Sequence, residues 1–128
     1  MPGRLFKRID TVFLPVRDLD QAIAWYSAHL GLGLLWKGEG VAALKVGETP
    51  LSLVQHRFPG LKEPPQDFEF RPVTEVPFNF FTGDIQKAHA ALQAAGIDVS
   101  EIVDQGRITD FQFKDPDGNL LGVCWWPE

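Results

Sequence analysis

The sequence predicts an α+β fold made of two similar βαβββ modules, which form a curved mixed sheet around a cleft and carry their helices on the outer face. Two observations lead to this prediction. A strand pattern, an amphipathic helix pattern and three short strand patterns follow one another twice along the 128 residues. A proline-rich segment, 57–77, separates the two occurrences. We therefore expect a single domain, 1–128, with modules at about 5–56 and 78–127.

The first module begins with an apolar, β-branched run from Ile9 to Val16, which is typical of a strand. Successive side chains of a strand point to opposite faces of its sheet. One apolar set of this strand is therefore expected to pack under the helix, and the other set to face the cleft. The first set is Val12, Leu14 and Val16.

A helix is expected next, because apolar residues recur at helical spacing from Leu19 to Leu30. Asp18 is placed to cap its first turn, and Gly31 to end it. Glycine-containing turns then separate three further strands. These strands are expected around 34–37, 41–46 and 51–55.

The second module repeats this order. A strand is expected over 78–82, and Asp84 is the second N-cap, followed by an apolar helical stripe that Gly96 ends. The turn 115–118, with the sequence Asp-Pro-Asp-Gly, separates the last two strands. The three strands after the helix are expected around 99–103, 109–114 and 120–126.

Composition narrows the function classes. The formal net charge is −5, which disfavours nucleic acids and anionic membranes as partners, since both require a basic surface. The single cysteine, Cys124, excludes an internal disulfide, and the N-terminus leads into a strand pattern without an apolar signal segment. No apolar run approaches the length that spans a bilayer. We therefore expect a cytoplasmic protein.

Two runs resemble the signatures of a known superfamily. Residues 16–26, Val-Arg-Asp-Leu-Asp-Gln-Ala-Ile-Ala-Trp-Tyr, together with 29–32, resemble the first-half signature of the vicinal-oxygen-chelate superfamily. Residues 113–120, Phe-Lys-Asp-Pro-Asp-Gly-Asn-Leu, resemble its second-half signature. That superfamily contains glyoxalase I, fosfomycin-resistance enzymes, bleomycin-resistance proteins and extradiol dioxygenases. The resemblance covers nearly the whole chain and implies the fold; it does not select an activity, because this fold hosts unrelated chemistries.

The resemblance also implies four positions at which the metal-binding members place their ligands. In this sequence they are occupied by Thr11, Ser52, Phe78 and Gly122. Hydroxyls are poor ligands for zinc, nickel or iron, and phenylalanine and glycine offer no ligand atom in their side chains. His29 and His89 are expected to point away from the cleft, on or beside the apolar stripes of the helices. We therefore predict that the protein has the fold without a metal and needs no cofactor.

The cleft is then expected to be apolar and aromatic with a few polar points, as small-molecule sites usually are. A flat or cationic ligand would suit it through stacking and cation–π attraction. The predicted ligand-binding residues are Thr11, Phe13, Ser52, Val54, His56, Phe78, Phe80, Asp110, Gln112 and Trp126.

Two alternatives stay open at the level of sequence. One is an enzyme of the same superfamily (a lyase, isomerase or dioxygenase) with atypical metal ligands, or with His56 and Asp110 as acid–base groups. The other is a dimeric structural or regulatory module whose cleft is filled by its own side chains. Cys124 is expected to be an inert buried thiol rather than a nucleophile. The resemblance also implies a homodimer.

Overall fold

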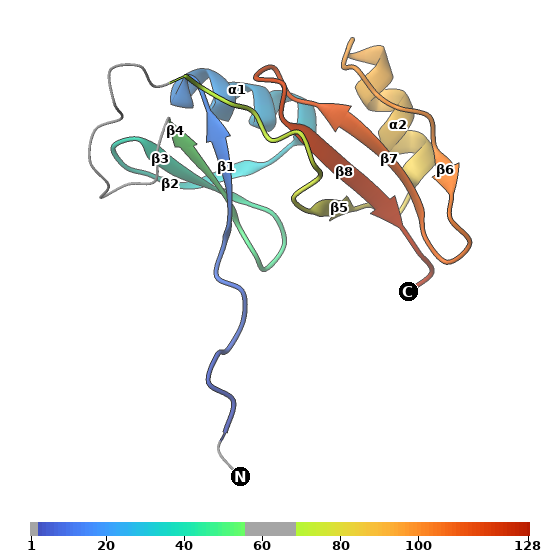
Figure 1. Ribbon diagram of the computed structural model, residues 1–128, viewed down its shortest axis with the longest axis horizontal. Helices are drawn as coiled ribbons and strands as arrows, with labels where there is room; N and C mark the ends of the chain where they lie inside the picture. The colour runs from blue at the N-terminus through green and yellow to red at the C-terminus, as the bar shows by residue number, and fades with distance from the viewer. Residues whose placement is uncertain (1–2, 56–68) are drawn as a thin grey trace. The chain divides into compact units, whose positions relative to one another are not determined.

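The computed structural model describes residues 3–55 and 69–128, and these form two compact units (Figure 1). The first unit ends at Phe70 and the second begins at Arg71. Each unit contains a four-stranded mixed sheet and one helix, and neither sheet is closed into a barrel. This confirms the predicted α+β fold with a repeated βαβββ order.

The first unit contains a parallel strand pair inside an otherwise antiparallel sheet. Its spatial order is β1-β4-β3-β2, with β1 parallel to β4 and the other neighbours antiparallel. A parallel pair needs a long crossover connection, and the helix lies within the one that joins these strands. The elements are β1 (Val12–Val16), α1 (Leu19–Leu30), β2 (Gly33–Lys37), β3 (Val41–Lys45) and β4 (Leu51–Gln55).

Helix α1 begins and ends where the sequence predicts. The Asp18 carboxylate accepts a hydrogen bond from the backbone N–H of Gln21 at 2.9 Å, which satisfies one of the free amides of the first turn. Gly31 adopts a left-handed conformation with φ of 71°, and its N–H bonds to the Ser27 carbonyl. Within the described residues, neither helix of the protein is long and apolar enough to cross a membrane.

The core of the first unit lies between α1 and its sheet. Leu14 and Val16 of β1 are fully buried, as are Leu53 of β4 and Tyr26 of α1. This confirms the predicted alternation along the first strand. We call the opposite side of each sheet its helix-free face. In the first unit, register pairs Phe13 with Ser52 on that face.

The second unit repeats the topology. Its sheet has the order β5-β8-β7-β6, with β5 parallel to β8 and the other pairs antiparallel. Asp84 caps its helix by accepting a hydrogen bond from the backbone N–H of Lys87 at 3.0 Å. The elements are β5 (Asn79–Phe81), α2 (Ile85–Ala94), β6 (Val103–Asp104), β7 (Thr109–Lys114) and β8 (Leu120–Trp125).

The strand expected over 99–103 is mostly absent. Only the two-residue β6 and an isolated bridge between Val99 and Phe113 form there. The Ser100 hydroxyl accepts the backbone N–H of Gln112 at 2.8 Å. The Ser100 hydroxyl thus accepts the N–H that the Ser100 carbonyl would accept in a regular antiparallel ladder. Serine side chains can compete with regular strand pairing in this way.

The turn 115–118 holds a buried polar network as well as reversing the chain. Asp115 accepts hydrogen bonds from the backbone amides of Asp117 and Asn119, each at 2.9 Å. The Asn119 side chain donates to Asp115 at 2.9 Å and accepts the backbone N–H of Val73 at 2.7 Å. Asn119 is fully buried, so it fixes the segment before β5 against the start of β8.

Candidate functional site

Two of the four positions implicated by the resemblance lie side by side in the first unit. The Thr11 and Ser52 hydroxyl oxygens are 2.7 Å apart, and Thr11 also donates to the Pro50 carbonyl at 2.9 Å. Both bonds form together when Ser52 donates to Thr11 and Thr11 donates to Pro50. These two hydroxyls therefore satisfy each other and the backbone.

The other predicted residues of the first unit share this helix-free face. Phe13 lies beside Ser52 across the β1–β4 ladder, and Val54 lies two residues further along β4. Ser52 and Val54 are buried, whereas the Phe13 side chain is 46% exposed. His56 lies outside the described residues. The structure thus gathers Thr11, Phe13, Ser52 and Val54 on one face.

In the second unit, register places Asp110 opposite Cys124 and Gln112 opposite Gly122. Cys124 is also paired with Phe81 of β5, so these residues share the helix-free face. Trp126 packs edge-on against Phe81, with ring centroids 5.2 Å apart. Asp110, Gln112 and Trp126 therefore lie on the side where the sequence places them.

The predicted face of β5 needs correction. Phe80 is paired with Val123 and stacks on the buried ring of Phe113 at 6.3 Å, while Phe78 packs edge-on against Phe80 at 5.1 Å. Phe80 therefore lies on the α2 side, and Asn79 and Phe81 occupy the helix-free face instead. Three phenylalanines within four positions give no alternation by which a sequence could set the phase of so short a strand.

Asn79 fills the space beside Gly122. A Cβ added to Gly122 would meet the amide of Asn79 and the Cγ1 of Val76, which lies 2.9 Å away. Gly122 is buried, so this close approach depends on its having no side chain. Neither Asn79 nor Val76 carries a sequence motif that points to this role.

These positions do not fit a metal ion. The Thr11 and Ser52 hydroxyls are bonded to each other, Phe78 has no ligand atom, and the space at Gly122 is taken by a neutral amide. Nowhere in ranges 3–55 and 69–128 do three histidine, cysteine, aspartate or glutamate side chains gather in a way that could hold an ion. The residues at these four positions therefore lack the side chains with which the metal-binding members of the superfamily would hold an ion.

The two described histidines lie away from the helix-free faces. His89 of α2 packs edge-on against Phe111 at 4.9 Å, and its Nε2 donates to the Ser100 carbonyl at 2.8 Å. His29 is exposed near the end of α1, with its ring centroid 5.3 Å from that of Trp25. Both placements agree with the expectation from helical spacing.

Cys124 is a buried free thiol beside a carboxylate. Burial raises the pKa of the Cys124 thiol, and the negative charge of Asp110 raises this pKa further. The thiol is therefore protonated at neutral pH, as an inert cysteine should be.

We expect iodoacetamide to alkylate Cys124 slowly near neutral pH, with the rate rising only well above the ordinary pKa of a cysteine. Replacing Asp110 with asparagine removes the nearby negative charge and should lower the thiol pKa, which raises the rate at about pH 8 by about twofold to threefold. Mass spectrometry of timed samples measures this rate. The exposed Asp98→Asn is the control, and an equal increase in that variant would contradict the role of Asp110.

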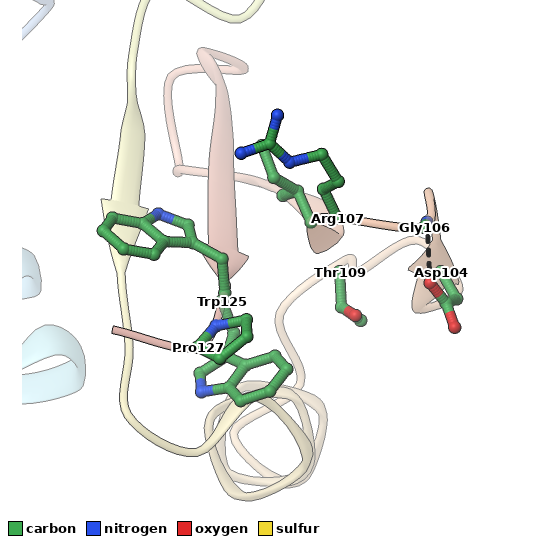
Figure 2. A pocket seen from close by; sticks show the side chains of 8 residues that line it. Asp104, Gly106, Arg107, Thr109, Trp125 and Pro127 are labelled. Carbon is green, nitrogen blue, oxygen red and sulfur yellow. Dashed lines mark hydrogen bonds between the residues drawn. The ribbon is translucent and has the colours of Figure 1, made fainter.

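A pocket opens at one end of the second unit, with a volume of about 640 Å³ (Figure 2). Its walls are the turn between β6 and β7 and the chain at the end of β8. In this turn the Gly106 N–H donates to the Asp104 carboxylate at 2.8 Å. Arg107 and Trp125 are lining residues that the sequence did not single out. The full lining is Asp104, Gly106, Arg107, Ile108, Thr109, Trp125, Trp126 and Pro127.

A model of the Glyoxalase/Bleomycin resistance protein/Dioxygenase superfamily matches residues 8–123. The chain belongs to this superfamily. The match spans both units, as the resemblance of the two signature runs predicts. In this superfamily member, the two four-stranded mixed sheets and the two helices match the fold of a solved glyoxalase-family structure.

Three solved structures share the fold over almost the whole chain. A putative glyoxalase family protein from Bacillus anthracis is 19% identical with a TM-score of 0.78, covering 98% of this chain and 100% of that one. A lactoylglutathione lyase from Agrobacterium tumefaciens is 21% identical with a TM-score of 0.75, covering 95% and 96%. An antibiotic binding protein from a Streptomyces species is 24% identical with a TM-score of 0.72, covering 98% and 100%.

Proposed function

We propose that this superfamily member binds a small aromatic molecule on a helix-free face, without a metal ion. One observation carries the proposal: none of the four positions implicated in metal binding presents a histidine, cysteine or carboxylate side chain. The Thr11 and Ser52 hydroxyls form a hydrogen bond, and the amide of Asn79 fills the space at Gly122. A ligand would therefore be recognised by the surrounding side chains themselves.

The helix-free face of the second unit has the chemistry for such a ligand. Phe81 and Trp126 form an edge-on pair, and their side chains are 41% and 43% exposed. Asp110 supplies a negative charge on the same face. Exposed aromatic rings that share a sheet face with a carboxylate suit a planar cation, which gains from both stacking and cation–π attraction.

Support also comes from the fold itself. The Streptomyces structure with this fold is named as an antibiotic binding protein, so a protein with this fold can bind a small molecule. A homodimer and a cytoplasmic location remain predictions from the sequence.

We expect the planar cation 1-methylquinolinium to quench tryptophan fluorescence at lower concentrations than neutral quinoline, by about threefold to tenfold in affinity. The Asp110→Asn variant should lose this preference because the attracting charge is gone. The Trp126→Ala variant should bind both compounds more weakly. Asp98→Asn is the matched control, because it removes an exposed carboxylate that does not share the helix-free ladder positions. Isothermal titration provides a second readout that does not depend on fluorescence.

Two results would contradict the proposal. One is a failure of both compounds, and of a wider aromatic panel, to bind the folded protein. The other is stoichiometric zinc, nickel, iron or manganese, measured by elemental mass spectrometry after incubation of protein purified without a chelating tag. Stoichiometric metal would instead favour the enzyme alternative.

A further inference from the structure

The pocket at the end of the second unit has the size of a ligand site. Its volume of about 640 Å³ lies in the range of pockets that hold small molecules, roughly 300–1,000 Å³. The turn 104–109 forms one wall and residues 125–127 form the other (Figure 2). It therefore lies beyond the last paired residues of β7 and β8, Thr109 and Trp125.

The turn is held in shape by its own hydrogen bonds. The Asp104 carboxylate accepts the Gly106 N–H at 2.8 Å, and the Gln105 N–H donates to the Ile108 carbonyl at 2.8 Å. Gly106 has a φ of 97°, a conformation that favours glycine. These contacts use the Asp104 carboxylate to shape the backbone and present Arg107 at the tip of the turn.

Arg107 places a cation on the wall of the pocket. Across the part of the chain that the structure describes, no acidic side chain lies within ion-pair distance of its guanidinium. In Figure 2 the Arg107 guanidinium points away from the Asp104 carboxylate. A planar guanidinium offers a fork of N–H donors that matches the two oxygens of a carboxylate.

Two indoles form the opposite wall. Trp125 and Trp126 are consecutive, so alternation within a regular strand would send them to opposite faces. Both nevertheless line the pocket, because β8 ends at Trp125 and Trp126 lies past the strand. Trp125 is half-buried and Trp126 is exposed, so each has ring surface available to a ligand.

We propose that this pocket binds a planar aromatic carboxylate, with Arg107 holding the carboxylate and the two tryptophans contacting the ring. The charge it selects is opposite to the one that Asp110 would favour on the helix-free face. Trp126 borders both sites, whereas Arg107 lines only the pocket. This second site goes beyond the proposed function and does not depend on it.

The test compares 2-naphthoate with 2-naphthamide, which has nearly the same shape and no charge. We expect naphthoate to bind the wild-type protein about fivefold to tenfold more tightly, as an exposed charge-assisted contact allows. Arg107→Ala and Arg107→Gln should each abolish this preference and leave naphthamide binding in place. Arg71→Ala, which removes an exposed arginine of the same unit outside the pocket, should keep it. Raising the salt to about 1 M should shrink the preference by screening.

Equal affinity for the acid and the amide would overturn the inference, as would absent binding of both compounds. A loss in Arg71→Ala as large as that in Arg107→Ala would also overturn it, since the effect would then come from general charge. Asp110→Asn separates the two proposals. This variant should weaken the binding of 1-methylquinolinium and leave the binding of naphthoate unchanged. Either proposal can therefore fail while the other stands.

Discussion

Replacing Asn119 with alanine should lower the free energy of unfolding by about 3 kcal/mol, because it leaves buried polar groups without partners. The backbone N–H of Val73 loses its acceptor at 2.7 Å, and the Asp115 carboxylate loses a side-chain donor at 2.9 Å. Asn119 is fully buried, so water cannot readily replace either bond. Urea unfolding followed by circular dichroism measures the change.

Gln86→Ala is the matched control for this prediction. Gln86 also carries a side-chain amide but lies exposed on α2, so its replacement should change stability by less than about 0.5 kcal/mol. A change for Asn119→Ala as small as that of the control would show that the network around the turn 115–118 contributes little. The role of the turn would then be confined to reversing the chain.

Replacing Gly122 with glutamate should destabilise the protein by about 2 kcal/mol, because the new side chain must displace its neighbours. Its Cβ alone would meet the Asn79 amide and the Val76 methyl group. The substitution places a carboxylate, a good metal ligand, at one of the four implicated positions. The Gly122→Glu protein should still bind no zinc, since Thr11, Ser52 and Phe78 supply no strong ligand. Urea unfolding and elemental mass spectrometry measure the two effects.

A double-mutant cycle tests the physical cause. Asn79 is exposed, so Asn79→Ala by itself should change stability little, but it should recover part of the loss caused by Gly122→Glu. Gly83→Ala is the control, because a Cβ there meets nothing within 4 Å and its backbone is not left-handed. Additive effects in the cycle, or stoichiometric zinc in Gly122→Glu, would contradict our account of this position.

The sequence predicts the fold well because its signals are local and agree with one another. Asp18 and Asp84 begin both helices, Gly31 ends the first, and alternation along β1 buries Leu14 and Val16. Each of these signals depends on residues only a few positions apart, where backbone geometry determines the outcome. The predicted neighbours on the helix-free faces follow from the same alternation.

Local signals fail where the chain has no regular period. The run from Phe78 to Phe81 carries phenylalanine on both faces, so only the parallel register with β8 decides that Phe81, and not Phe80, shares a face with Cys124. Where a regular strand is expected over 99–103, the backbone N–H of Gln112 instead donates to the Ser100 hydroxyl. The spacing of residues along the chain predicts neither the face of Phe81 nor the bond to Ser100, because each depends on a partner distant in sequence.

The sequence by itself determined the repeated βαβββ order, the superfamily and the residues at the four implicated positions. Only the tertiary structure decided what those residues do: Thr11 and Ser52 bond to each other, and Asn79 occupies the space that Gly122 leaves. It also decided that Arg107 and the two tryptophans share one pocket. The reason is physical, since hydrogen-bond partners, close contacts and pockets arise from strand register and turn geometry, which bring together residues from separate parts of the chain.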